Sequence, residues 1–197
     1  MSYDNIKAVI EALLFASEKP LTLEQIKNTL DGLDTGEIRR LLREMQSEYE
    51  SGRRGLRIME IADGFRMATA SEFAPFLKKM YKQRRVERLS RPALETVAIV
   101  AYKQPVTKLE IESIRNVNVD GLMENLLEKG IIRVAGRKKA PGRPKLYGTT
   151  RQFLEYFGLR SLEELPKIEG LGLPAQIQEK PQAQKEEAQN ATREVTQ

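Results

Sequence analysis

The chain has 197 residues, 40% hydrophobic and 31% charged, so it can bury a core beneath a strongly solvated surface. It contains no Cys and no His, which excludes disulfides, cysteine nucleophiles and any catalysis or metal binding by imidazole. The net charge of +5 permits contact with nucleic acid without requiring it. We find no signal-peptide pattern, and the longest nearly apolar stretch, 8–16, is too short for a membrane span. We therefore expect a cytoplasmic protein that contacts no membrane.

The first elements along the chain predict a winged helix. An apolar helix and a Pro-containing turn lead to Thr22-Leu-Glu-Gln25, a capping box that opens a second helix. Asp34-Thr-Gly-Glu37 is a similar pattern and opens a third helix. Residues 56–62 and 65–70 read as two strands, with a two-residue type I′ turn at Asp63-Gly64.

A weak internal repeat then predicts a second copy of the same unit. With Pro20 aligned on Pro105, an offset of 85, apolar and Thr positions of the two copies coincide. The matching pairs are Leu21 with Val106, Thr22 with Thr107, and Ile26 with Ile111. The second copy continues with a capping box at Thr107-Lys-Leu-Glu110, a third helix around 122–127, and strands at 131–135 and 146–150.

These elements predict a mainly α fold with small β-hairpin wings (α+β), arranged as two tandem winged-helix domains. The predicted domains are residues 1–85 and 86–166, with a linking helix at 73–82 and a short closing helical segment at 153–165. Residues 167–197 lack aromatic side chains and are rich in Gln, so we expect a disordered tail.

The first helix of each copy is more apolar than a surface helix. A helix that is apolar nearly all round is buried on more than one side, and a domain of this size offers little room for that. One interpretation is a homodimer contact on the first helix of the chain, and the other is an ordinary deep core helix. The candidate dimer residues are Ile6, Val9, Ile10 and Leu13. Ala8, Ala12 and Phe15 form a second apolar stripe on the flank of the same helix.

The third helices carry the wrong charge for reading DNA. A tandem winged-helix DNA-binding transcriptional regulator is the alternative function, because a recognition helix of this kind enters the major groove. Segments 34–50 and 119–129 each have a net charge of −2, whereas affinity for DNA comes largely from neutralising phosphates. The charges favour contact with protein over contact with DNA.

The positive charge is concentrated in the second wing. Residues 86–150 have a net charge of +5, and 133–145 contain six basic residues and no acid. A contact with the DNA backbone or with an acidic partner is one interpretation, and a solvated hairpin tip is the other. The candidate contact residues are Arg137, Lys138, Lys139, Arg143 and Lys145. The segment does not match a nucleotide-binding Walker A loop, and no residue is marked as catalytic, so we expect neither a cofactor nor enzymatic activity.

Several motifs in a fixed order carry a family resemblance. They are Glu11-Ala-Leu-Leu-Phe-Ala-Ser17, Leu94-Glu-Thr-Val-Ala-Ile-Val-Ala-Tyr102, Gln104-Pro-Val-Thr107, Pro141-Gly-Arg-Pro144 and Tyr156-Phe-Gly158. Together they resemble the bacterial family of segregation and condensation protein B, and the resemblance covers about residues 5–166.

The resemblance implies a non-enzymatic, cofactor-free subunit of the SMC–kleisin condensin-like complex, which acts at the nucleoid in chromosome condensation and segregation during cell division. Members of the family form homodimers through the N-terminal domain. They bind the kleisin, segregation and condensation protein A, largely through the C-terminal domain, and reach the SMC ATPase through it. DNA contact is then at most weak and non-specific. The expected kleisin-binding residues are Tyr102, Val106, Ile111 and Ile114.

Overall fold

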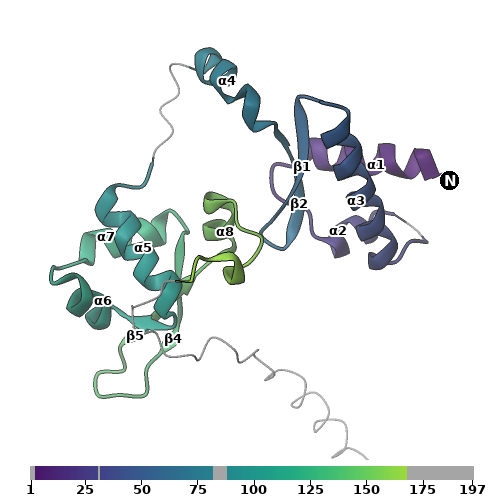
Figure 1. Cartoon of the computed structure of the whole chain (residues 1–197). Coiled ribbons are helices and arrows are strands. Elements are labelled where there is room, and N and C mark those ends of the chain that lie inside the picture. Colours follow the sequence, from purple (N-terminus) through teal and green to yellow (C-terminus); the bar gives the residue numbers. More distant parts are fainter. Residues whose placement is uncertain (1–2, 31, 82–87, 168–197) are drawn as a thin grey trace, which may run out of the picture. The chain divides into compact units, whose positions relative to one another are not determined.

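The computed structural model describes residues 3–30, 32–81 and 88–167. Residues 1–166 form one compact unit, which contains two groups of helices, each with its own β-hairpin (Figure 1). The predicted domain boundary at residues 85 and 86 lies outside the described residues. So does the predicted tail, apart from Lys167.

The first group has the helix–helix–helix–hairpin order of a winged helix, as predicted. Its elements are α1 (Tyr3–Ala16), α2 (Leu23–Lys27), α3 (Thr35–Ser51), β1 (Leu56–Ile61) and β2 (Gly64–Thr69). Both predicted capping boxes are present: the side chains of Thr22 and Asp34 accept from the backbone N–H three residues on, and the N3 side chain accepts in return. These caps satisfy backbone donors that the helix cannot pair internally.

The turn of the first hairpin lies one residue earlier than predicted. Ile61 pairs with Gly64, so Ala62 and Asp63 form the turn, and both have positive φ, 51° and 55°. Gly64 belongs to the strand for a steric reason. A Cβ at this position would lie 2.8 Å from the carbonyl oxygen of Leu21. The glycine therefore serves a close backbone approach, not the turn conformation.

The predicted linking helix is shorter than expected. A single 3₁₀ turn, η1 (Ser71–Phe73), leads into α4 (Ala74–Met80), which has Pro75 in its first turn. Figure 1 shows α4 following the first hairpin. Residues 82–87 lie outside the described residues.

The second group repeats the first and adds a strand. Its elements are α5 (Arg91–Lys103), β3 (Val106–Thr107), α6 (Lys108–Arg115), α7 (Asp120–Glu128), β4 (Ile132–Arg137), β5 (Lys145–Thr149), α8 (Arg151–Phe157) and η2 (Leu162–Glu164). The sheet order is β3-β5-β4, all antiparallel, with a register shift between Val134 and Gly136. The short strand β3 was not predicted; its counterpart in the first group is an isolated bridge between Leu21 and Phe65. The fold class is confirmed as mainly helical, with two winged helices and small antiparallel hairpins.

Each group has its own hydrophobic cluster. The first comprises Ile10, Leu14, Ile26, Leu30, Ile38, Leu41, Leu42, Met45, Tyr49, Ile58 and Phe65. The second is built mainly from Leu89, Ala93, Val97, Val100, Ala101, Val106, Ile111, Val119, Met123, Leu126, Ile131, Ile132, Tyr147, Phe153 and Leu154. Burial of this apolar surface is the main favourable contribution to folding.

The tip of the first hairpin packs against the end of the second group. Ile61 and Ala62 belong to the second cluster, and the backbone N–H of Ala62 donates to the carbonyl of Leu159 at 2.9 Å. The N–H of Asp63 donates to the carbonyl of Arg160 at 3.0 Å. The predicted closing segment, now α8 and η2, thus binds backbone from the first hairpin.

We expect Leu126→Ala to lower the free energy of unfolding by about 2–5 kcal/mol, because Leu126 is fully buried in the second cluster and the change leaves a cavity. Leu109→Ala is the matched control. Leu109 is 74% exposed, so its loss should change stability by no more than about 0.5 kcal/mol. Urea denaturation followed by circular dichroism measures both, and equal effects would contradict the assigned core.

Candidate interaction surfaces

Most of the predicted dimer residues on α1 face the core of their own domain. Ile10 is 0% exposed and belongs to the first hydrophobic cluster, so it has no surface left for a second copy. Ile6 and Val9 are half-buried and pack against the same cluster. Leu13 is half-buried. Of the four residues, three therefore keep part of their surface exposed, and Ile10 keeps none.

The apolar surface that α1 leaves exposed is the second predicted stripe. Phe15 is 75% exposed, and Ala8 and Ala12 are exposed as well. Their spacing of four and three residues puts them on one face of the helix. We call Ala8, Ala12 and Phe15 the α1 stripe. An exposed phenylalanine beside small residues is a surface that a second helix can approach closely.

Ion pairs hold α1 against α3 beside this stripe. The ammonium group of Lys7 lies 3.2 Å from a carboxylate oxygen of Glu44 and 2.6 Å from one of Glu48. The hydrogen bond to Glu48, followed by that to Glu44, raises the pKa of Lys7 above its ordinary value. Two of the acidic groups on α3 are thereby paired within the domain.

The predicted kleisin-binding residues also divide between core and surface. Val106 and Ile111 are 2% and 0% exposed and lie in the second cluster. Tyr102 is half-buried, and its hydroxyl donates to the carbonyl of Pro166 at 2.7 Å. Ile114, which is 47% exposed, is the one of the four with an open apolar side chain.

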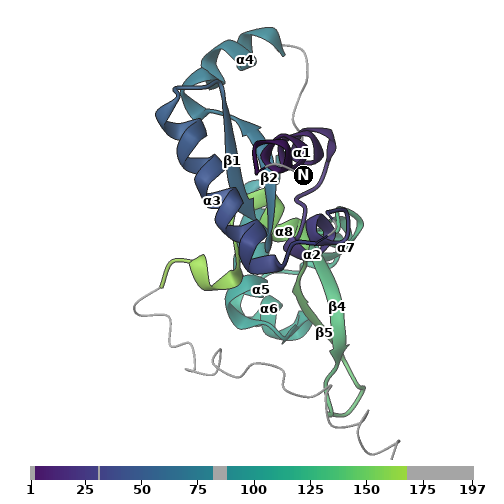
Figure 2. The same ribbon diagram turned by 90° about the vertical axis from the view of Figure 1, so that its right-hand side faces the viewer.

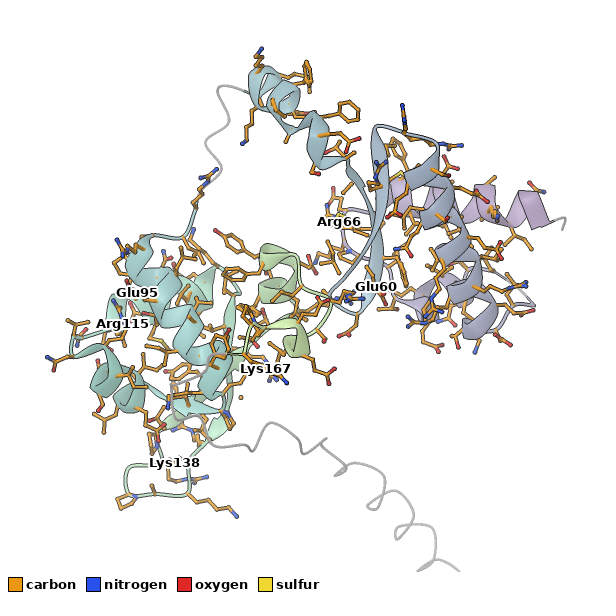
Figure 3. All side chains as sticks on the ribbon, in the orientation of Figure 1. Glu60, Arg66, Glu95, Arg115, Lys138 and Lys167 are labelled. Atoms are coloured by element: carbon orange, nitrogen blue, oxygen red, sulfur yellow. The ribbon has the colours of Figure 1, made fainter. Side chains whose placement is uncertain are left out.

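Other exposed apolar side chains lie near Ile114 in sequence. Leu109 on α6 is 74% exposed and Val117, just after α6, is 52% exposed. The end of α6 is fixed to α5, because the guanidinium of Arg115 donates to Glu95 and to the hydroxyl of Thr96, both at 2.9 Å (Figure 3). We call Leu109, Ile114 and Val117 the α6 surface. The sequence prediction did not include Leu109 and Val117, because the sequence alone does not show which apolar residues are buried in the core and which are exposed.

The third helix of the second group carries a row of carboxylates. Asp120, Glu124 and Glu128 recur every four residues along α7 and are all exposed. The hydrogen bond from Lys108 lowers the pKa of Asp120. A helix with this row on its surface would repel the phosphates that line a major groove. This placement argues against the recognition-helix function that a transcriptional regulator requires.

The predicted basic residues of the second wing all lie exposed on one hairpin. Arg137 ends β4, Lys145 begins β5, and Lys138, Lys139 and Arg143 lie in the turn between them. Lys138, which Figure 3 labels on this hairpin, donates to Glu110 at 2.7 Å. Glu110 also accepts the backbone N–H of Thr107 at 2.7 Å, as the N3 member of the α6 capping box. These bonds, that from Lys138 first, lower the pKa of Glu110 from 4.5 to about 2.

The described residues contain no group of three or more acidic side chains placed to hold a metal ion. In the same part of the chain, every buried side-chain nitrogen or oxygen has a hydrogen-bond partner. Over those residues we also find no helix with the length and apolar character needed to cross a membrane.

Comparison with known proteins gives a consistent set of relatives. The family model described as segregation and condensation complex subunit ScpB matches residues 8–168. Segregation and condensation protein B of Symbiobacterium thermophilum is 48% identical over 169 residues, covering 86% of this chain and 76% of the relative. The protein of the same name from Moorella thermoacetica is 45% identical over 166 residues, covering 84% of each chain.

Two solved structures are also similar in sequence. ScpB from Mycobacterium tuberculosis is 34% identical, with a TM-score of 0.40, and the match covers 81% of this chain and 98% of that one. A dimer of an ScpB N-terminal domain complexed with an ScpA peptide is 36% identical, with a TM-score of 0.37. That match covers 39% of this chain and 95% of the solved one.

We expect Glu110→Gln to destabilise the protein at neutral pH, and the deficit to disappear in acid. Gln keeps the capping box, as Gln25 does in α2, but it loses the ion pair with Lys138. Folding lowers the pKa of Glu110 from 4.5 to about 2. The ionised carboxylate therefore stabilises the folded state at pH values above 4.5, and this stabilisation is lost as the pH falls towards about 2.

Urea unfolding at a series of pH values measures this difference. Lys138→Gln removes the same pair from the other side and should show the same pH dependence. A deficit that stays constant down to pH of about 2 would mean that the ion pair with Lys138 is not its source, and would contradict this prediction.

Proposed function

Because this chain belongs to the segregation and condensation complex subunit ScpB family, we propose that it is a non-enzymatic subunit of the bacterial SMC–kleisin condensin-like complex. The family model spans residues 8–168, nearly the whole of the described chain, and its description is that of a subunit of a complex. The proposed role is chromosome condensation and segregation at the nucleoid. Exposed apolar side chains such as Phe15 and Leu109 support a role in binding other proteins.

The first part of the proposal is a homodimer formed through the first domain. The α1 stripe supports it, since Phe15 is the most exposed large apolar side chain described. Ile6, Val9 and Leu13 flank the stripe and keep part of their surface exposed. Ile10 stabilises the helix from the core side and takes no part in the contact.

The second part is binding of the kleisin, segregation and condensation protein A, by the second domain. The α6 surface supports it: three apolar side chains are exposed within nine residues, and Arg115 holds the end of the helix in place. A flexible kleisin segment can cover such a surface without any rearrangement of the fold. Contact with the SMC ATPase then runs through the kleisin.

A tandem winged-helix transcriptional regulator is the competing function. The row of carboxylates on α7 opposes it, because the helix that should read the bases is lined with negative charge. The net charge of −2 over segment 34–50, which contains α3, opposes it as well.

We expect Phe15→Asp to convert the dimer into a folded monomer, because a buried unpaired carboxylate at the contact is costly. Sedimentation equilibrium at micromolar concentration measures the mass, and circular dichroism checks the fold. Phe76→Asp is the matched control, as Phe76 is 68% exposed on α4 of the same domain and should leave the dimer intact. A monomeric unmodified protein, or a dimeric Phe15→Asp variant, would contradict the proposed contact.

We expect Leu109→Asp combined with Ile114→Asp to weaken kleisin binding at least about tenfold, the equivalent of about 1.4 kcal/mol. Co-purification with the kleisin, followed by mass determination and calorimetric titration, measures this. Met59→Asp, at an exposed apolar position of the first hairpin, is the control. Loss of binding in the Met59 variant but not in the double variant would move the kleisin contact to the first domain.

A further inference from the structure

The hairpin formed by β4, β5 and their connecting turn carries a concentration of positive charge. We call residues 133–145 the basic wing; it holds six exposed cations and no acidic residue. These cations are Arg133, Arg137, Lys138, Lys139, Arg143 and Lys145. Whether this charge is available to a ligand depends on how many of the six cations are paired with a carboxylate of the chain.

Almost none of this charge is neutralised within the chain. Among the described residues, Lys138 is the one member paired with an acid, through Glu110. Arg133 and Arg137 donate instead to the backbone carbonyls of Thr149 and Arg143, which orients them but leaves their charge in place. Lys139, Arg143 and Lys145 have no carboxylate partner in the described part of the chain.

Two of the cations face each other directly. In the register of the sheet, Arg137 on β4 is opposite Lys145 on β5. Like charges at directly opposed positions destabilise a hairpin. A neutral pair at these two exposed positions would make the hairpin more stable than Arg137 and Lys145 do. A bound anion between the two strands would relieve it.

The turn of the wing is ordered by its own backbone. The N–H of Lys138 donates to the carbonyl of Pro144 at 2.9 Å, and the N–H of Arg143 donates to the carbonyl of Ala140 at 2.9 Å. Gly142 and Arg143 both have positive φ, at 76° and 42°. The cations are therefore carried by a preorganised loop, so binding does not have to pay for ordering it.

The composition of the wing suits phosphate better than protein. Protein interfaces are built around an apolar core and are depleted in Lys. Between Arg137 and Lys145, the apolar side chains are those of one alanine and two prolines, and the rest is Gly and cation. A phosphate backbone, by contrast, requires only positive charge and donors at an accessible edge.

We propose that the basic wing binds the phosphate backbone of DNA without reading its sequence. This goes beyond the proposed role as a protein-binding subunit, because it gives the chain a direct contact with the chromosome. Figures 1 and 2 both show the tip of the β4–β5 hairpin projecting away from α7. The wing can therefore reach a duplex while the carboxylate row of α7 stays clear of it.

Fluorescence anisotropy with the full chain and a labelled duplex of about 30 base pairs tests this, over a series of salt concentrations. We expect weak binding that falls steeply with salt. Lys139→Glu combined with Arg143→Glu should lower the affinity at least about tenfold at about 50 mM salt. The slope of log K against log salt should become shallower by about 2, one per removed cation.

The control variant changes the net charge by the same amount, but on α4 instead of the basic wing. Lys78→Glu combined with Lys79→Glu alters two exposed lysines of α4 and should leave the salt slope unchanged. Equal loss of affinity in both double variants would mean that net charge, not the wing, holds the DNA, and would overturn the proposal. Should charge reversal unfold the second domain, Lys139→Gln with Arg143→Gln gives the same test without adding acids.

Two further outcomes would overturn the proposal. Discrimination of more than about tenfold between two unrelated duplexes would indicate base reading, which the wing does not provide. The other is an unmodified protein that binds no duplex at low salt. If the wing variants then also lose the kleisin, the wing is assigned to an acidic protein segment.

Discussion

In each domain, a short backbone pairing joins the segment before the second helix to the hairpin, and so holds the hairpin against the helices. In the first domain Leu21 and Phe65 exchange two hydrogen bonds of 2.8 Å, and in the second Val106 pairs with Tyr147. Leu21 and Val106 occupy equivalent places in the internal repeat, each directly before the Thr that caps the next helix. Because one residue joins the sheet and the next starts a helix, the hairpin cannot shift its register without uncapping that helix.

The starts of helices can be predicted from the sequence because the interactions that cap them involve only neighbouring residues. A capping box needs only four residues, so Thr107 and Glu110 identify the start of α6 without knowledge of the fold. The turn of the first hairpin was predicted one residue late, since Gly64 is explained by the carbonyl of Leu21, more than 40 residues away. The candidate sites depend on the same kind of distant contact. The apolar residues of α1, and those in and around α6, look alike in sequence whether they face the core or a partner, and packing assigns Ile10, Val106 and Ile111 to the core.

Charge divides the second domain into two surfaces with different chemistry. The carboxylates of α7 and the cations of the basic wing belong to the same domain, and the net charge of the chain describes neither. Lys138 of the wing pairs with Glu110 of α6, and the same carboxylate accepts the backbone N–H of Thr107 in the α6 capping box. Among the described residues, none of the other wing cations has a carboxylate partner, and Arg137 lies directly opposite Lys145, a like-charge pair that disfavours the hairpin. Residues that weaken the fold and remain exposed are better explained by a ligand than by folding.

The proposed dimer and the proposed DNA contact strengthen each other through geometry alone. A single wing with a few phosphate contacts binds weakly at physiological salt, because dissolved cations compete with the protein for the phosphates. A dimer carries two wings, so once the first is bound, the second meets the same duplex at a high effective concentration if the span allows it. Weak and sequence-independent contacts of this kind can be made and released as DNA moves, while the proposed kleisin contact of the α6 surface would keep the subunit attached to its protein partner. Strong binding by one wing would instead fix the complex at one place on the chromosome.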